Sequence, residues 1–262
     1  MSNNFWRNSP QIVDIERAKE SFIRDFRYVK DMGYIRSHRS HNTGIGKTFE
    51  DVMRIQENNL KIADYQGCIE IKSQRDYTKS MITLFTKSPT YPANANLFLR
   101  DHYGSPDADS GYNKLHTTMI HSIYNTFFNQ WGFKLEINDL ERRLEIKIKN
   151  LRTNLIENAL IYYSFDDLNQ IIGTKCGLIA YITADTRNVE NHEEFHFTNS
   201  ILLSNLTIQR FIDNVRNDNI KYDIRIGAFR SGIKIGKVHD HGSGFRVRRE
   251  NLSNLFDIEE IS

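Results

Sequence analysis

The chain has 262 residues, with 35 Lys and Arg against 33 Asp and Glu, so its formal net charge is +2. Hydrophobic residues make up 39% of it, which favours a folded protein with a sizeable core over a disordered one. No apolar run approaches the roughly 18 residues of a membrane span, and no secretion signal opens the chain. Cys68 and Cys176 are too few for a disulfide framework or a four-cysteine zinc site. We therefore expect a soluble, cytoplasmic protein, and the near-zero charge gives no sign of a nucleic-acid partner.

Apolar residues at helical spacing predict two helices in the N-terminal part of the chain. Over 12–32, the residues Ile15, Phe22, Phe26 and Val29 recur near the helical period, and Gly33 follows as a stop. A second helix is predicted over 48–59, with Phe49, Val52 and Met53 as its buried edge.

The segment 43–48, Thr-Gly-Ile-Gly-Lys-Thr, is similar to a phosphate-binding loop. That loop needs a glycine at position 41, where this chain has His41, and an apolar strand before it, where this chain is polar and basic. The segment therefore indicates a glycine-rich turn that starts the next helix, and a nucleotide-hydrolysing role is not supported.

Farther along the chain the apolar pattern changes to the period of a strand. In Cys68–Lys72 the two isoleucines share one face, and Glu70 and Lys72 share the other. Strands are also predicted over 80–86, 144–149, 159–163, 177–183 and 221–229, with a helix over 205–217. Residues 88–112 hold three of the four prolines and are expected to form a long irregular connection. We expect a mixed α/β chain with one central sheet and added strands.

Acidic and basic side chains gather around the strand at Cys68–Lys72. Asp64 lies just before this strand, beyond a turn that Gly67 permits, and Glu70 and Lys72 leave the strand on one side. Two carboxylates at the entrance of a strand suit Mg²⁺, and a neighbouring lysine can orient a water or stabilise charge on a phosphate. Glu50, on the preceding helix, is a candidate outer ligand. The same pattern also occurs on ordinary solvated strands, and the spacing alone leaves both interpretations open.

A series of short blocks resembles the MvaI/BcnI family of restriction endonucleases, in the order and at the separations typical of that family. The resemblance covers nearly the whole chain, and its blocks are Asn42–Asp51, Ile69–Lys72, Thr83–Thr90, Leu99-Arg100, Tyr103-Gly104, Asp223–Ala228, His239–Gly242 and Phe245-Arg246.

The resemblance implies a PD-(D/E)XK nuclease fold of the MutH-like branch, bilobed, with a DNA-binding cleft. It implies a monomeric type II restriction endonuclease that uses Mg²⁺, with Mn²⁺ as a substitute, to cut double-stranded DNA at a short CC-N-GG-like site. Asp64, Glu70 and Lys72 match the catalytic trio, and Glu50 matches the acidic residue of the upstream helix. We expect Asp64, Glu70 and the carbonyl of Ile71 to hold the metal. We place an approximate catalytic lobe at 1–125 and a DNA-recognition lobe at 126–262.

The C-terminal part of the chain has the composition of a DNA-reading segment. Residues 221–249 carry eight Lys and Arg against two acids, a charge of +6, while 250–262 carry −4, so the overall charge conceals a basic segment. Alternation turns Tyr222, Ile224 and Ile226 inward and puts Asp223 and Arg225 together on the other face. An arginine can donate to guanine, and a carboxylate can accept from cytosine.

A second donor and acceptor set is predicted from the turn at His239, Asp240 and His241 together with Arg246. In the resembling family, residues at the positions of Asp223, Arg225, Asp240, His241 and Arg246 contact bases. A metal site at the two histidines is an alternative, but it lacks an evident third ligand. The remaining candidates for DNA contact are Lys47, Lys87, Arg100, Tyr103 and Arg230. The segment 87–103 is equally a minor-groove or backbone clamp or a mobile surface loop.

The family has Tyr-His where this chain has Phe229-Arg230. The central base pair of the DNA site that this protein recognises therefore cannot be inferred from the family. We expect an enzyme of a bacterial or archaeal cytoplasm, paired functionally with a protective DNA methyltransferase and not with a membrane. The alternatives are a MutH-like repair nickase and a DNA-binding protein that has lost catalysis.

Overall fold

The computed structural model describes residues 14–55, 62–108 and 110–261. Within these residues the chain forms two compact units. Unit 1 consists of the segment up to Thr78, Leu178–Leu203 and the end of the chain from Glu259, and unit 2 consists of Lys79–Gly177 and Ser204–Ile258. The two units are interleaved along the chain, unlike the consecutive lobes expected from the sequence. The separate roles of two lobes stay a prediction.

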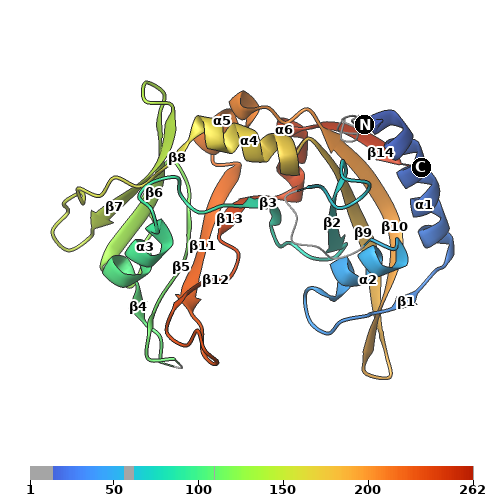
Figure 1. Cartoon of the computed structure of the whole chain (residues 1–262), viewed down its shortest axis with the longest axis horizontal. Coiled ribbons are helices and arrows are strands. Elements are labelled where there is room, and N and C mark those ends of the chain that lie inside the picture. Colours follow the sequence, from blue (N-terminus) through green and yellow to red (C-terminus); the bar gives the residue numbers. More distant parts are fainter. Residues whose placement is uncertain (1–13, 56–61, 109, 262) are drawn as a thin grey trace, which may run out of the picture. The chain divides into compact units, whose positions relative to one another are not determined.

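Unit 1 is a five-stranded sheet with helices against its apolar face (Figure 1). The strand order is β1-β10-β9-β2, and β14 pairs with β10. The elements of this unit are α1 Ile15–Asp31, β1 Ile35–Arg36, α2 Gly44–Val52, β2 Glu70–Arg75, β9 Leu178–Val189, β10 His192–Ser204 and β14 Asp257–Ile261.

The apolar core of unit 1 contains the buried faces of both α1 and α2. Phe22 and Phe26 on α1, and Phe49 on α2, are buried, and the ring of Phe49 packs against that of Phe197 on β10 at 5.0 Å between centroids. The predicted stripe on α1 is correct except at Ile15, which is 50% exposed in the first turn. The helix predicted over 48–59 begins earlier, at Gly44, and ends at Val52; residues 56–59 of that prediction lie outside the described residues.

Unit 2 has a six-stranded and a three-stranded sheet, where the sequence predicted strands added to one central sheet. The orders are β3-β13-β11-β5-β4, with β12 paired to β11, and β6-β7-β8. The elements are β3 Ile82–Thr86, α3 Ala95–Tyr103, β4 Ser105–Pro106, β5 Asn113–Met119, β6 Trp131–Asn138, β7 Arg143–Asn150, β8 Tyr162–Ser164, α4 Phe165–Lys175, α5 Ile208–Arg216, β11 Ile220–Ala228, β12 Val238–Asp240, β13 Gly244–Val247, the 3-10 helix η1 Arg249–Asn251 and α6 Leu252–Leu255.

The expected irregular connection over 88–112 is wrong, because α3 and β4 lie inside it. Ala95, Leu99 and Tyr103 are buried at every fourth position of α3, and the prolines flank this helix without interrupting it. In the described part of the chain, no helix is long and apolar enough to cross a membrane.

Candidate functional site

A tight turn before β2 places the carboxylate of Asp64. Gln66 and Gly67 adopt φ values of 49° and 75°, the left-handed region that glycine tolerates best. The backbone N–H of Tyr65 donates to the carbonyl of Ile69 at 2.8 Å and closes the turn. Asp64 Oδ2 accepts a hydrogen bond from the backbone N–H of Ile71 at 2.9 Å. The Asp64 carboxylate therefore lies against the backbone between Glu70 and Lys72.

Glu70 and Lys72 emerge from the same side of β2, as their spacing predicts. Lys72 Nζ donates to Glu70 Oε1 at 2.7 Å, and only 5% of Glu70 is exposed. Their neighbours Ile69 and Ile71 turn to the other face and join the apolar core. A carboxylate this deeply buried needs a paired cation or hydrogen bonds to stay ionised. The structure thus brings together the three side chains proposed as the catalytic trio.

Glu50 and Lys47 lie on α2, which packs against β2. Glu50 is partly buried. Lys47 Nζ donates to Asp51 Oδ1 at 2.7 Å, and this hydrogen bond is the main cause that lowers the pKa of Asp51. A contact between Lys47 and DNA would compete with this ion pair, and that contact stays a prediction.

The segment 43–48 has the structural role that its sequence indicates, the start of a helix. Thr48 is completely buried, and its hydroxyl donates to the carbonyl of Gly44 at 2.8 Å and accepts from the backbone N–H of His38 at 2.9 Å. These hydrogen bonds occupy the hydroxyl that a phosphate-binding loop would direct to a metal.

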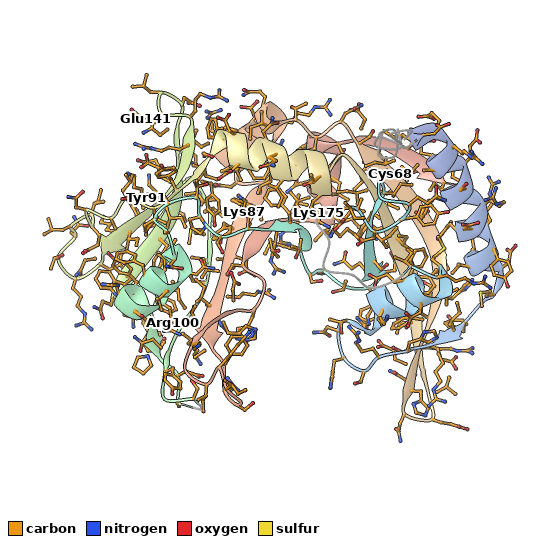
Figure 2. All side chains as sticks on the ribbon, viewed as in Figure 1. Cys68, Lys87, Tyr91, Arg100, Glu141 and Lys175 are labelled. Carbon is orange, nitrogen blue, oxygen red and sulfur yellow. The ribbon has the colours of Figure 1, made fainter. Side chains whose placement is uncertain are left out.

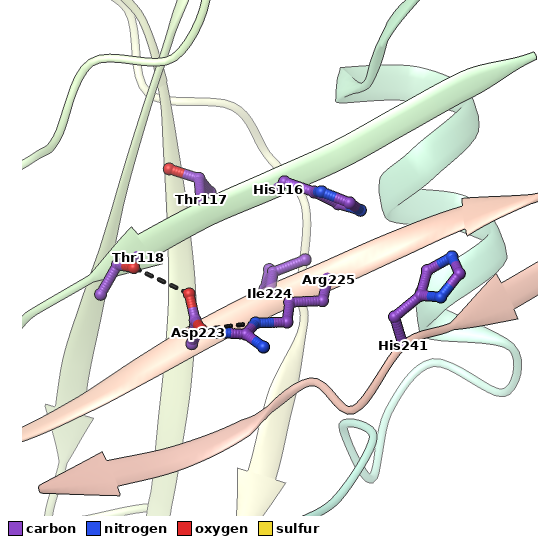
Figure 3. Close-up of a pocket in the computed structure, with 7 residues that line it drawn as sticks. All are labelled: His116, Thr117, Thr118, Asp223, Ile224, Arg225 and His241. Atoms are coloured by element: carbon purple, nitrogen blue, oxygen red, sulfur yellow. Dashed lines mark hydrogen bonds and ion pairs between the residues drawn. The ribbon is translucent and has the colours of Figure 1, made fainter. Parts of the chain in front are cut away.

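In unit 2, Asp223 and Arg225 lie side by side on β11, as predicted from the alternation of that strand (Figure 3). Arg225 Nε donates to Asp223 Oδ2 at 2.8 Å, and the hydroxyl of Thr118 on β5 donates to Asp223 Oδ1 at 2.8 Å. The side chain of Arg225 is 45% exposed and that of Asp223 only 11%. The pair therefore presents a guanidinium to solvent and holds its carboxylate within a hydrogen-bonded network.

Arg246 belongs to the Asp223 cluster, although the sequence placed it with Asp240. The antiparallel register pairs Arg246 on β13 with Lys221 on β11, so Arg246 emerges on the face that carries Asp223. Its Nε lies 3.1 Å from Asp223 Oδ2 without a hydrogen-bond geometry, and its side chain is 11% exposed. Burial lowers the pKa of Arg246, and the charge of Arg225 lowers it further.

The carboxylate of Asp240 anchors the turn after β12. Its Oδ1 accepts from the backbone N–H groups of Gly242 at 2.9 Å and Ser243 at 2.6 Å, and its Oδ2 accepts from Asn96 Nδ2 at 2.7 Å. His239 stacks on Phe229 with 4.1 Å between ring centroids, and His241 contacts His239 at the same separation. The turn is thus held by Asp240, and direct base contact by Asp240 stays a prediction.

An open pocket of about 420 Å³ lies beside the Asp223 cluster (Figure 3). It is lined by His116, Thr117, Thr118, Asp223, Ile224, Arg225 and His241. Burial lowers the pKa of both histidines, so each imidazole is neutral near pH 7 and carries one donor and one acceptor.

The three residues contributed by β5 were missed by sequence reasoning. The alternation of buried Leu115 and Met119 with polar residues was a usable signal for that strand. It does not reveal that β5 lies next to β11, where His116 is paired with Arg225.

The other residues of unit 2 that were predicted to contact DNA differ in how far their side chains are exposed. Tyr103 is 6% exposed, and its ring packs edge-on against that of Trp131 at 5.0 Å between centroids. Arg100, labelled on α3 in Figure 2, is 7% exposed, and its Nη1 donates to the carbonyl of Gly236 at 3.3 Å. Both side chains serve the fold of unit 2. Lys87 is partly buried near Asp167, and Arg230 is exposed. Direct DNA contact by these four residues stays a prediction.

Comparison with known proteins identifies the family. The family model described as the MvaI/BcnI restriction endonuclease family matches residues 23–256. A solved structure of restriction endonuclease MvaI in complex with its cognate DNA substrate is similar to this chain, with a TM-score of 0.86 and 35% identity, covering 93% of this chain and 98% of that one. MvaI in the absence of DNA gives a TM-score of 0.62 and 34% identity, covering 94% and 98%. No curated protein sequence matches the chain significantly.

These matches confirm the family indicated by the sequence blocks and the expected mixed α/β fold of the PD-(D/E)XK type. The family model spans both units and includes Asp64, Glu70, Lys72, Asp223 and Arg225. The chain therefore belongs to the MvaI/BcnI restriction endonuclease family, a family of type II site-specific deoxyribonucleases.

Proposed function

We propose that this enzyme hydrolyses phosphodiester bonds of double-stranded DNA at a short, near-palindromic, G·C-rich site of the CC-N-GG type, with Mg²⁺ as cofactor. The observation that carries the proposal is the cluster on β2, in which Asp64 is fixed to the backbone of Ile71 and Lys72 is held on Glu70. The MvaI structure in complex with a cognate DNA substrate supports duplex DNA as the ligand of this chain as well.

The oxygen atoms of this cluster fit a magnesium ion. Asp64, which accepts the N–H of Ile71, and the neighbouring Glu70 offer two carboxylates, and the carbonyl of Ile71 is proposed as a third oxygen ligand. Within the residues that the structure describes, no group of three or more His, Cys, Asp and Glu forms a metal site. Two carboxylates and a carbonyl suit Mg²⁺, which takes few carboxylates and keeps several waters. Bound there, Mg²⁺ would supply a Lewis acid that favours deprotonation of water and offsets charge on the phosphate. Mn²⁺, also an oxygen-binding divalent ion, is expected to substitute.

Lys72 is suited to orient the attacking water and to stabilise negative charge on the scissile phosphate. Its ammonium is held 2.7 Å from Glu70 Oε1, so its direction is set before DNA binds. Asp64 accepts the N–H of Ile71, and this bond fixes the carboxylate that completes the site. Glu50 on α2 is proposed as an outer group of the same site.

In unit 2, we propose that Asp223 and Arg225 contact a G·C pair from the major groove. Arg225 offers the exposed donor fork, and Asp223 offers the acceptor. His241 and Arg246 are proposed as further contributors, the first through its neutral imidazole and the second by holding Asp223.

The experiment is cleavage of a supercoiled plasmid with and without Mg²⁺, with sequencing of the fragment ends. We expect a nicked intermediate followed by linear DNA, at a rate proportional to enzyme concentration. This is the behaviour of a monomer that cuts the strands in turn. Lys72→Ala should abolish cleavage and retain DNA binding in EDTA. The matched control is Lys19→Ala on α1, because Lys19 is 23% exposed and paired with Glu16, much as Lys72 is 24% exposed and paired with Glu70.

The outcomes separate the alternatives. If the reaction stops at nicked circles, the protein is a nickase. If wild type and Lys72→Ala both bind DNA and neither cleaves with Mg²⁺, the protein is a DNA-binding relative without catalysis. We further propose that the enzyme acts in the cytoplasm beside a methyltransferase that protects the host's own sites, and methylated plasmid should then resist cleavage.

A further inference from the structure

The loop between β11 and β12 carries the most exposed large apolar side chain in the described part of the chain. Ile233 is 102% exposed, and Ile235 is 56% exposed. Burying an isoleucine side chain stabilises a complex by about 1.5–3 kcal/mol, so this tip retains unused apolar surface. A single exposed isoleucine needs no explanation. Two exposed isoleucines in one loop indicate a binding surface only where other features of the loop point to a ligand.

The loop holds these side chains in a defined turn. The backbone N–H of Gly236 donates to the carbonyl of Phe229 at 3.0 Å, and that of Ile235 donates to the carbonyl of Gly232 at 3.0 Å. Arg100 Nη1 donates to the carbonyl of Gly236 at 3.3 Å. The ring of Tyr112 packs against the loop at the same glycine. The tip is therefore presented on an ordered base, which reduces the entropy lost on binding.

The charge of the loop matches nucleic acid. Residues 229–239 contain Arg230, Lys234 and Lys237 and no acidic residue. Lys234 Nζ lies 5.5 Å from the centroid of the Phe229 ring, on the loop itself. Exposed isoleucines among three cations suit a duplex, whose backbone is anionic and whose thymines present a methyl group in the major groove.

The position of the loop along β11 indicates which base pairs it would reach. Phe229 lies four positions after Arg225, which is about 13 Å at roughly 3.3 Å per residue of strand. That length corresponds to about four base pairs at roughly 3.4 Å each. If Arg225 contacts a base of the recognised site and β11 runs along the duplex axis, the loop tip beyond Arg230 lies over the DNA that flanks this site.

We propose that the loop tip 231–237 reads flanking DNA, with Ile233 and Ile235 against thymine methyl groups in the major groove and Lys234 and Lys237 on phosphates. The proposal rests on the base-reading role proposed for Asp223 and Arg225. It predicts that sites embedded in T-containing flanks are bound and cut faster than sites whose flanks lack the methyl group.

The test uses duplexes that share one recognised site and differ only in flanking dT or dU, since dU lacks the methyl group. Binding is measured in EDTA and cleavage with Mg²⁺. We expect the wild-type enzyme to favour dT flanks about threefold to fivefold, the effect of burying one methyl group. Ile233→Ser/Ile235→Ser should lose this preference and keep the same site and thermal stability. Leu140→Ser is the control, because Leu140 is 91% exposed in the turn between β6 and β7.

Two further results extend the test. Lys234→Ala/Lys237→Ala should weaken binding equally with dT and dU flanks and reduce its salt dependence. The proposal is overturned if the wild type does not distinguish dT from dU. It is also overturned if the double serine variant keeps the distinction, or if it changes only the oligomeric state in sedimentation, which would make the tip a protein contact. An enzyme that shows the dT preference in binding but cleaves nothing would refute the proposed function and leave the flank contact standing.

Discussion

Two arginines share the carboxylate of Asp223, and their burial predicts opposite consequences of removing each. Arg225 has 45% of its side chain exposed, so its ion pair should contribute no more than about 1 kcal/mol to folding. Its proposed contact with guanine corresponds to about 1–3 kcal/mol, and each 1.4 kcal/mol is about a factor of ten. Arg225→Ala should therefore lower kcat/KM on cognate DNA about 5-fold to 150-fold with an almost unchanged thermal midpoint.

Arg246 should behave in the opposite way. Arg246 and Asp223 each have 11% of the side chain exposed, and removing one partner of a buried ion pair costs about 3–5 kcal/mol. Arg225 and Thr118 still hold the carboxylate, so Arg246→Ala should lie at the lower end, about 3 kcal/mol. At about 2–4 °C per kcal/mol, the midpoint of unfolding should fall by roughly 6–12 °C.

The assay combines thermal unfolding followed by circular dichroism with cleavage of a single-site duplex. Arg210→Ala is a matched control, because Arg210 is 43% exposed and lies 2.9 Å from Asp257, outside the Asp223 cluster. It should leave both readouts unchanged. The division of roles is wrong if Arg225→Ala unfolds as early as Arg246→Ala, or if Arg225→Ala cleaves at the wild-type rate.

Two further predictions concern stability. Burial, then His239 and His116, lower the pKa of His241 from 6.5, so below that pH the unfolded chain binds more protons. The stability that neutral His241 contributes is complete above about pH 6.5 and is lost as pH falls through the lowered pKa. His241→Gln should therefore weaken the pH dependence of the free energy of unfolding in urea, and an unchanged dependence would contradict this. Gly44→Ala should destabilise unit 1 by about 1–3 kcal/mol. The Cβ added by the alanine would lie 2.3 Å from the carbonyl oxygen of Arg39. Gly46→Ala, with 4.0 Å of space, should be neutral or stabilising, and equal thermal midpoints for the two variants would refute this explanation.

Local patterns predicted the elements whose buried face follows from a single segment. The faces of β2 and β11 follow from strict alternation, because residues two apart in a strand share a side. Asp223 beside Arg225 and Glu70 beside Lys72 are therefore predictable pairs, and both are present. Asp64 was identifiable as the acid before the turn, and Gly67 marks that turn.

The errors arose where composition was given more weight than periodicity. Three prolines suggested an irregular connection over 88–112, yet Pro89 and Pro92 lie before α3 and Pro106 lies after it. The helix between them needed only the recurrence of buried residues at every fourth position. At the start of α1, Ile15 suggested a buried first turn, but Ala18 is the first buried residue, since Ile15 follows directly on the N-cap Asp14 and lies at the end of the helix.

The remaining part of the candidate site depends on strand register, which a single sequence does not encode locally. Thr118 and His116 reach the pocket because β5 pairs with β11 so that Asp223 faces Thr118 and Arg225 faces His116. A shift of one residue would turn the polar side chains of β5 toward the core and its apolar ones toward the pocket. Leu115 and Met119 are both completely buried, and this burial selects the register. The core of unit 2 therefore determines which side chains meet Asp223, and His116, the pocket residue least visible in the sequence, is placed by apolar residues that never touch the pocket.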